Sequence, residues 1–366
     1  MTWSPLLNPP EFPAAEYNRL GSRLGAVLET ANDVVVVPGE AIVALEAVAT
    51  DLGTPGYPVL NVVTSPYGKL FGQWLASSGS PVLNLSSTPG LPVTIADIEE
   101  AVDRFSPRAI AIVHGEAASG IVNPLAEIAG FARSRGLLTI VDAVASVGAE
   151  PLPVDDWGLD IVVIGPQKAL LGPAGISAVA VSQTGWAALA ANAAPRADLS
   201  SVSLVDIKRD WLDSDRSVIP GTPAPLELWA LDAALARFEA IGLRESINAH
   251  QTAKRAVRAM VRSLGLELWV ADNDASALTT TVVVPAGIDP GDLARTAHGS
   301  FGALVSTGVG PGAERLVRVN HTALAAAFGP AAANVVGLLA ALRRHGFTGP
   351  DHGALDAVVA AYAAAP

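Results

Sequence analysis

Short hydrophobic runs alternate along the chain with longer segments whose apolar residues recur every three or four positions. The short runs predict buried strands, and the spacing of the longer segments predicts amphipathic helices. The predicted strands are 34–37, 59–63, 110–113, 138–141, 161–164 and 176–181, and the clearest predicted helices are 95–105, 124–135 and 225–241. Such alternation predicts an α/β domain with a mostly parallel sheet flanked by helices.

The pattern changes near residue 246, where a long helical segment is followed by short apolar stretches and further helices. Strands are predicted near Ala303 and Leu316, and a last long helix is predicted over 330–344. This second pattern indicates a smaller C-terminal α+β domain. We therefore expect three parts, namely an N-terminal arm (1–19), a large cofactor-binding domain (20–245) and a small domain (246–366).

Composition narrows the classes of function. The chain has 366 residues, a net charge of -12 and no cysteine. An acidic chain without clustered Lys and Arg is not expected to bind nucleic acid. No apolar run reaches the roughly 18 to 20 residues that a membrane span needs, and the first residues lack a secretory signal pattern. We expect a cytoplasmic enzyme that acts on small molecules without a metal ion.

Two charged residues follow predicted strands of the parallel sheet. Lys168 comes shortly after the strand 161–164, and Asp142 comes directly after the strand 138–141. In such sheets ligands bind beyond the carboxyl ends of the strands. A partly desolvated lysine can form a Schiff base with a carbonyl cofactor, and an aspartate can keep a pyridinium nitrogen protonated. The pair predicts that chemistry, although an ordinary solvated lysine remains the alternative.

Three longer stretches extend this interpretation. They are "VTSPYGKLFGQW", "IVHGEAASGIVNPLAEIA" and "LTIVDAVASVGAEPLPVDDWGLDIVVIGPQKALLGPAG". Together they resemble the class V aminotransferases, which are pyridoxal-phosphate enzymes of fold type I, and the resemblance covers nearly the whole chain. It implies a seven-stranded sheet in the large domain, and a homodimer or homotetramer with the active site at the subunit interface. It also implies that Lys168 forms the Schiff base and that Asp142 partners the pyridine nitrogen.

The same resemblance implies roles for further residues. Tyr67, in "SPYG", matches the aromatic residue that stacks on the cofactor ring, and Val144 matches the residue that packs on the other face of the ring. Gln167 and Thr222 match positions on the phosphate side of the cofactor, with Thr222 supplied by the neighbouring subunit. In "GAERLVRVNHTAL", Arg318 matches the arginine that binds the substrate carboxylate, for which its planar fork is suited.

Arg315 ranks below Arg318 as a carboxylate-binding residue. It lies three positions before Arg318 and would point to the opposite face of a regular strand.

The segment "VVVVPGEAIVALEAV" departs from the usual family pattern. Where most members carry small and hydroxylated residues that hold the cofactor phosphate, this chain has Glu40, Ala41 and Ile42. A carboxylate there would repel a phosphate dianion by several kcal/mol, on the order-of-magnitude scale of Coulomb's law. One branch of the family has a glutamate at this place and uses unphosphorylated pyridoxal or pyridoxamine. The alternative is that Glu40 only caps the following helix.

The expected cofactor is accordingly pyridoxal 5'-phosphate or unphosphorylated pyridoxal or pyridoxamine. The expected reaction moves an amino group between pyridoxamine, or a small amino acid, and a small 2-oxo acid such as pyruvate. Two residues depart from the branch pattern, namely Val309 in place of a second carboxylate-binding arginine and Ala117 in place of a hydroxyl residue. The alternatives left open are an orthodox pyridoxal-phosphate aminotransferase of the alanine or serine–glyoxylate type, a β-eliminating lyase, and a non-catalytic binding protein.

Overall fold

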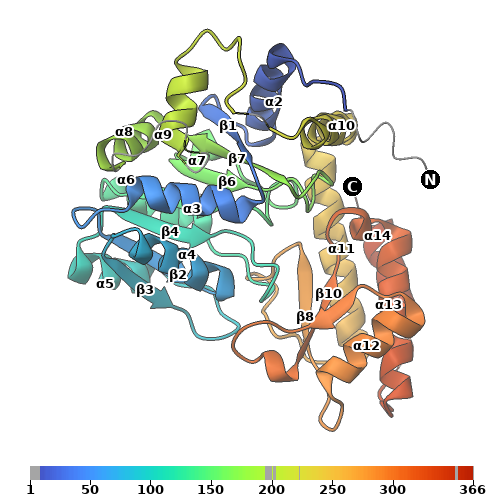
Figure 1. The fold of residues 1–366 in the computed structure, drawn as a ribbon. Coiled ribbons are helices and arrows are strands. Elements are labelled where there is room, and N and C mark those ends of the chain that lie inside the picture. The colour runs from blue at the N-terminus through green and yellow to red at the C-terminus, as the bar shows by residue number, and fades with distance from the viewer. Residues whose placement is uncertain (1–8, 194–199, 201–202, 222, 351–352, 366) are drawn as a thin grey trace.

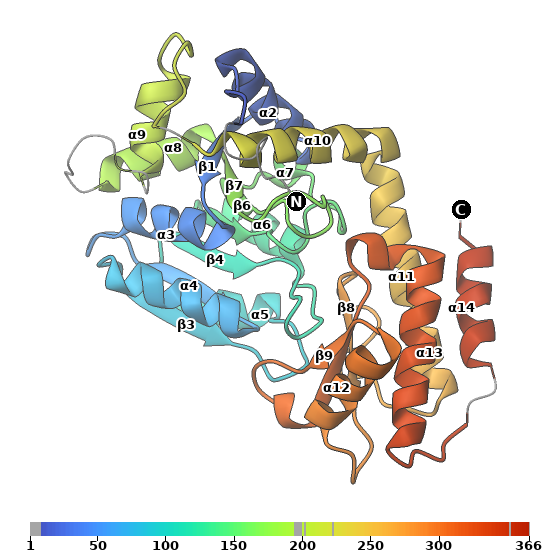
Figure 2. The same cartoon turned by 45° about the vertical axis from the view of Figure 1, so that its right-hand side comes forward.

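The computed structural model describes residues 9–193, 200, 203–221, 223–350 and 353–365 (Figure 1). The chain forms a large part built on a seven-stranded sheet and a smaller part built on a three-stranded sheet. Figures 1 and 2 show the smaller part beside one end of the large sheet. The expected division at residue 246 falls inside one long helix, α11 (Leu243–Ser263), and stays a prediction.

The large sheet has the mostly parallel form that the sequence predicts. Its strands are β1 (Asp33–Pro38), β2 (Val59–Val63), β3 (Val82–Ser86), β4 (Ala109–Val113), β5 (Leu138–Asp142), β6 (Ile161–Ile164) and β7 (Ile176–Val181). Their order is β1-β7-β6-β5-β4-β2-β3, and β7 runs antiparallel to both of its neighbours. The fold class is therefore confirmed. The pattern alone missed β3, an edge strand whose residues are only partly buried.

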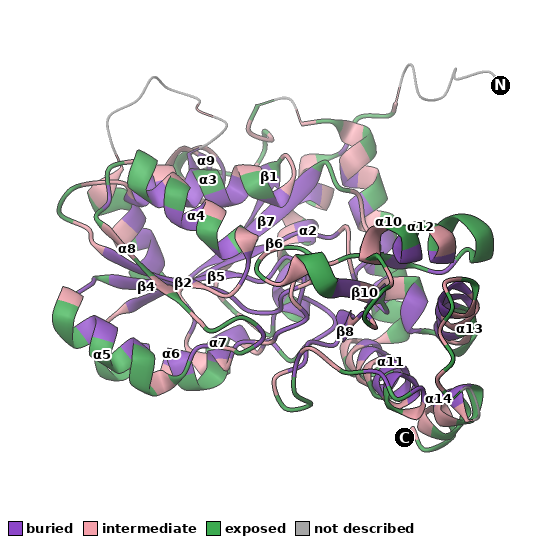
Figure 3. Cartoon of the chain, turned by 90° about the horizontal axis from the view of Figure 1, so that it is seen from below, coloured by how far each residue is buried: buried purple, intermediate pink, exposed green. Residues whose placement is uncertain are grey.

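Helices cover both faces of this sheet, as Figure 3 shows for α3, α4 and α9 on one side and α5, α6 and α7 on the other. On the first face lie α3 (Ala41–Leu52), α4 (Pro66–Ser77), α8 (Gln183–Asn192) and α9 (Leu204–Ile207), which is followed by the π-helical turn η1 (Lys208–Leu212). On the second lie α2 (Ala14–Val27), α5 (Ile95–Phe105), α6 (Leu125–Ser134), α7 (Val154–Trp157) and α10 (Pro225–Ile241). Successive strand residues point to opposite faces, so Val34 and Val36 enter one core while Val35 and Val37 enter the other.

The smaller part surrounds an antiparallel sheet. Its strands β8 (Thr279–Val283), β9 (Val305–Thr307) and β10 (Leu316–Asn320) lie in the order β8-β10-β9. Around them are α11, α12 (Pro290–Phe301), α13 (Phe328–Arg344), α14 (Ala354–Ala363) and the short turns η2 (Ala313–Arg315) and η3 (Ala323–Ala326). Among the helices described here, none combines the length and apolar character that a membrane crossing requires.

The two parts meet at the carboxyl end of the large sheet. Ile121, in the loop after β4, forms a bridge with Ala275 of the smaller part. The carboxylate of Glu150, beyond the end of β5, accepts a hydrogen bond from the backbone N–H of Ala277. The residues that follow β4 and β5 therefore lie against the segment that leads into β8.

Candidate active site

Asp142 and Lys168 lie in one buried site at the junction of the two parts. Asp142 is the last residue of β5, and its Oδ1 accepts a hydrogen bond from the backbone N–H of Val144 at 3.0 Å. Burial raises the pKa of Asp142, and the nearby Lys168 charge partly offsets this rise. Burial likewise lowers the pKa of Lys168, with a partial offset from the carboxylates of Asp142, Glu116 and Glu40. The net shift is toward the neutral amine, which is the nucleophilic form of lysine.

Tyr67 contributes an aromatic face to this site. It lies in the first turn of α4, where the Ser65 hydroxyl accepts a hydrogen bond from the Tyr67 N–H and Pro66 begins the helix. The Lys168 Nζ atom is 5.9 Å from the centre of the Tyr67 ring, which is 49% exposed. Val144 is buried in the loop after β5. The structure therefore brings four of the sequence-predicted residues together, while their assigned roles remain predictions.

Glu40 stands at the start of α3, directly after the turn at Gly39. Its Oε2 accepts a hydrogen bond from the Ile42 N–H at 2.9 Å, so the side chain does cap the helix. Its Oε1 accepts a second hydrogen bond from Gln167 Nε2 at 3.0 Å. Gln167 and Lys168 line the same cavity, so the hydrogen bond to Gln167 places the capping carboxylate of Glu40 beside the site. Its charge raises the pKa of both Asp142 and Lys168.

The residues around Glu40 complete this end of the site. Ala41 is buried, and Ile42 is 42% exposed. Gln167 Oε1 is buried and has no hydrogen-bond partner. The expected role of Thr222 cannot be compared with the fold, because that residue lies outside the described residues.

Arg318 lies on β10, across a cavity of about 290 Å³ that Lys168 and Gln167 also line. Its Nε donates to the Thr307 carbonyl at 2.9 Å, and its Nη1 donates to the Ala117 carbonyl at 2.8 Å. A guanidinium has five N–H donors, so the remaining ones are available to a carboxylate. Burial lowers the pKa of Arg318.

The ranking of Arg315 below Arg318 assumed that both residues lie on one regular strand. In the structure Arg315 precedes β10 and does not lie on a strand. It ends the turn η2, and its guanidinium lies 4.7 Å from the centre of the Trp269 ring.

Two buried residues after β4 have different characters. His114 bonds the Ser146 hydroxyl at 3.0 Å and packs edge-on against Trp157, and burial lowers its pKa to about 4. It is a neutral structural residue at neutral pH. Glu116 accepts a hydrogen bond from the Thr64 hydroxyl at 2.7 Å, its Oε2 has no partner, and burial raises its pKa to about 7.

Sequence reasoning missed several residues that line the cavity. They are Leu278, Thr279, Ser306, Asn320, Thr322 and Ala323, all from the smaller part. Ser306 pairs with Arg318 in the β9–β10 register. Asn320, Thr322 and Ala323 lie in the segment "GAERLVRVNHTAL" that carries Arg318, so the alternation along that strand could have pointed to Asn320. The other residues come from segments that carry no comparable signal.

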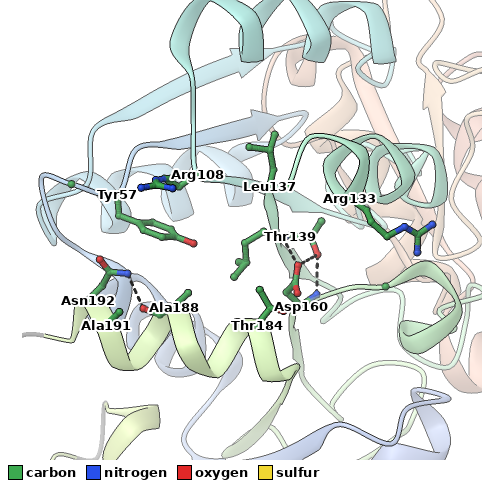
Figure 4. A pocket seen from close by; sticks show the side chains of 14 residues that line it. Tyr57, Arg108, Arg133, Leu137, Thr139, Asp160, Thr184, Ala188, Ala191 and Asn192 are labelled. Atoms are coloured by element: carbon green, nitrogen blue, oxygen red, sulfur yellow. Dashed lines mark hydrogen bonds between the residues drawn. The ribbon is translucent and has the colours of Figure 1, made fainter.

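A larger cavity, of about 620 Å³, lies at the opposite end of the sheet, where the strands begin (Figure 4). Arg108, Tyr57 and Asp160 line it, and Asp160 is already hydrogen-bonded by the Thr139 N–H at 3.0 Å. Nothing there resembles the lysine and carboxylate pair. Across the described part of the chain, no group of three or more His, Asp or Glu side chains is arranged for a metal ion.

The site fits one end of a phosphorylated pyridoxal better than the other. Lys168, Asp142 and Tyr67 provide an amine, a buried acid and an aromatic face, which suit an aldehyde-bearing pyridine ring. The phosphate end, expected at the start of α3, holds the Glu40 carboxylate beside the orphaned acceptor of Gln167. The residues present therefore fit the ring and do not fit a dianion.

Comparisons with known proteins agree with this geometry. The family model "Aminotransferase class-V" matches residues 73–327. The chain is 34% identical to the pyridoxamine–pyruvate transaminase of Mesorhizobium japonicum, over 83% of this chain and 77% of that protein. It is 29% identical to the alanine–glyoxylate aminotransferase of Callithrix jacchus, over 80% of this chain and 71% of that protein.

Two solved structures share the whole fold. The pyridoxamine–pyruvate aminotransferase of Mesorhizobium loti superposes with a TM-score of 0.90 at 29% identity, covering 96% of this chain and 89% of that chain. The ureidoglycine–glyoxylate aminotransferase of Bacillus subtilis superposes with a TM-score of 0.89 at 26% identity, covering 96% and 90%. The chain therefore belongs to the class V aminotransferase family.

Proposed function

We propose that this aminotransferase moves an amino group between unphosphorylated pyridoxamine and a small 2-oxo acid such as pyruvate. The observation that carries the proposal is the pair of acceptors formed by the Glu40 carboxylate and the orphaned Oε1 of Gln167. The Gln167 oxygen has no donor, and the Glu40 carboxylate, which already accepts from Ile42 and Gln167, has lone pairs left for one more hydrogen bond. A hydroxymethyl group offers an O–H, whereas a phosphate dianion offers only acceptors and repels the carboxylate.

The protein's own residues divide the work as follows. A bound pyridoxal ring supplies the carbonyl carbon and the electron sink for amino transfer. Asp142, buried and oriented by the Val144 N–H, holds a proton at the ring nitrogen. Lys168, whose pKa burial lowers, would act on a carbonyl as the neutral amine and would then accept and return a proton as a general base.

Binding and orientation of the acid fall to the smaller part. Arg318, held by two carbonyl groups, presents its remaining N–H groups to a substrate carboxylate. The Tyr67 ring lies beside Lys168, with its centre 5.9 Å from Nζ, and offers an aromatic face on which a bound pyridine ring would stack.

The proposal includes a homodimer or homotetramer with the active site at the subunit interface. Its support is the exposure of Ile42 and Tyr67, which are 42% and 49% exposed although they border the site. A cytoplasmic location remains part of the proposal as well.

A direct test incubates the purified chain with pyridoxamine and pyruvate and measures pyridoxal and alanine formation. Borohydride reduction after incubation with pyridoxal, followed by mass spectrometry, reports whether an adduct forms on Lys168. We expect both signals with the unphosphorylated ring. Faster turnover of pyridoxal phosphate with a small amino donor would favour the orthodox aminotransferase and overturn the proposal. Ammonia release without an acceptor would instead indicate elimination.

A further inference from the structure

A second cavity, of about 360 Å³, lies beside the 290 Å³ cavity that Lys168 and Arg318 line, and the proposed function assigns it no role. Its walls are mainly apolar and come from separate parts of the chain, including Pro66, Pro89, Trp269, Val309 and Leu316. Several hydroxyl groups and the side chain of Lys69 complete its lining. Within the described residues, the linings of the two cavities share no residue.

The two cavities are neighbours along two independent segments. On β10, Leu316 lines the second cavity and Arg318 lines the first, and residues two apart on a strand face the same side about 6.6 Å apart. In the loop after β4, the carbonyl of Ala117 binds Arg318, and the next residue, Ala118, lines the second cavity. A group bound at Arg318 is therefore about one side-chain length from the second cavity.

Close packing fixes the walls of the second cavity. A Cβ atom added at Gly90 would lie 3.2 Å from Trp269, and one added at Gly310 would lie 3.2 Å from Pro66. The Arg315 guanidinium also stacks on the Trp269 ring. These contacts leave the cavity preformed, which reduces the ordering that a bound side chain would require.

We propose that the second cavity holds the side chain of the amino acid or 2-oxo acid whose carboxylate binds Arg318, and that this side chain is apolar and about as large as a phenyl group. The inference rests on the amino transfer of the proposed function and goes beyond it in the acid, which carries a phenyl-sized apolar side chain in place of the methyl group of pyruvate. A cavity of about 150 Å³ lined by apolar side chains is enough for benzene, so 360 Å³ accommodates a phenyl group together with its linking carbons. The methyl group of pyruvate would leave most of this apolar wall in water.

The test uses unreactive acids, so that binding is measured without turnover. Calorimetric titration of the full chain compares propionate, 3-phenylpropionate and glutarate. We expect 3-phenylpropionate to bind roughly tenfold tighter than propionate or more, from the apolar area that the ring buries. Equal affinity for these two acids would overturn the inference. Tightest binding of glutarate would overturn it as well, because it would mean that Lys69 selects a second carboxylate.

Two matched variants locate the effect. Val309→Gln places a polar amide in the wall of the cavity without adding a cation that would bind carboxylates, and Val359→Gln makes the same change on α14, where the valine is similarly exposed (38% and 46%). The preference for 3-phenylpropionate should fall at least about fivefold in Val309→Gln and stay unchanged in Val359→Gln. An equal change in both variants, or no change in either, would place the ring elsewhere and refute the assignment. Pyridoxal binding is measured separately, so failure of the cavity assignment and failure of the proposed function give different results.

Discussion

The acceptor pair at the start of α3 predicts that one carboxylate decides between pyridoxal and its phosphate. Glu40→Ser removes the charge and keeps a side chain that caps helices well, so α3 should remain intact. The matched control is Glu46→Ser, which makes the same change on the exposed side of the same helix.

The size of the effect follows from the hydrogen bond between Glu40 and Gln167. Glu40 Oε1 lies 3.0 Å from Gln167 Nε2. A phosphate oxygen accepting from the same amide would lie about 3 Å from that nitrogen, and so roughly 6 Å from the carboxylate. At an effective dielectric of about 40 for this half-buried place, Coulomb's law gives ~1.4 kcal/mol for each unit of charge. A dianion is then repelled by about 3 kcal/mol, which corresponds to roughly a hundredfold in affinity.

The assay is an absorbance titration of each protein with pyridoxal and with pyridoxal phosphate. In Glu40→Ser, the phosphate form should bind roughly a hundredfold tighter than in the unsubstituted chain. Pyridoxal should bind several-fold weaker, because a hydrogen bond worth about 1 kcal/mol loses its acceptor. Both affinities should be unchanged in Glu46→Ser.

Two results would refute this reasoning. One is an unsubstituted chain that already prefers the phosphate form, and the other is a Glu40→Ser variant whose ratio of affinities does not change. Either result would leave Glu40 as a helix cap without a part in cofactor choice.

Three further predictions concern the buried groups. Asp142→Asn should lower kcat roughly a hundredfold or more, because an amide cannot hold the proton on the ring nitrogen. Tm should not fall, because the substitution adds no buried charge. An unaltered kcat would contradict the role assigned to Asp142. Arg318→Lys should raise KM for the 2-oxo acid about 10- to 100-fold by loss of the forked contact, with pyridoxal binding unchanged, and steady-state kinetics beside a pyridoxal titration checks this. Burial raises the pKa of Glu116 from 4.5 to about 7, so the folded chain keeps a proton that the unfolded chain releases, and stability falls as pH rises through this range. Between pH 5 and pH 8, the fall in the free energy of unfolding should be smaller in Glu116→Gln than in the unsubstituted chain by up to about 3 kcal/mol, as measured by urea unfolding. An equal fall in both proteins would refute this prediction. His114, whose pKa burial lowers to about 4, contributes in the opposite direction in both proteins and cancels in the comparison.

Most of the large sheet could be predicted from the sequence, because its central strands are buried on both faces. β6 is an unbroken apolar run, β5 is interrupted by Thr139 alone before it ends at Asp142, and the bounds of both agree with the prediction to within one residue. The edge strand β3 mixes polar and apolar residues and is only partly buried, so its pattern is weak. The hydrophobic pattern of a strand reflects how far its residues are buried, so a partly exposed edge strand has a weaker pattern than a central one.

The site divides in the same way between what the pattern can predict and what it cannot. Asp142 and Lys168 were predictable, because the carboxyl ends of neighbouring parallel strands converge whatever the loops do. The contact of Glu40 with Gln167 joins residues 127 positions apart and depends on two loop conformations. The sequence placed a carboxylate at the helix start, and only the structure shows that it both caps the helix and faces the site.

The charges around Lys168 also argue for a ring without a phosphate. Of the described groups whose charge acts on its pKa, Asp142, Glu116 and Glu40 are acids and Arg318 is the one cation. Arg318 is balanced once a substrate carboxylate binds, and a protonated ring is balanced by Asp142. Adding a dianion beside Glu40 would leave its two charges and that of Glu40 without a described counter-ion in a partly desolvated space, and Glu116 would add a further charge whenever it is ionised, which is costly. A neutral hydroxymethyl group adds no charge, and its O–H would donate a hydrogen bond to the Glu40 carboxylate, so this balance of charges favours the unphosphorylated ring.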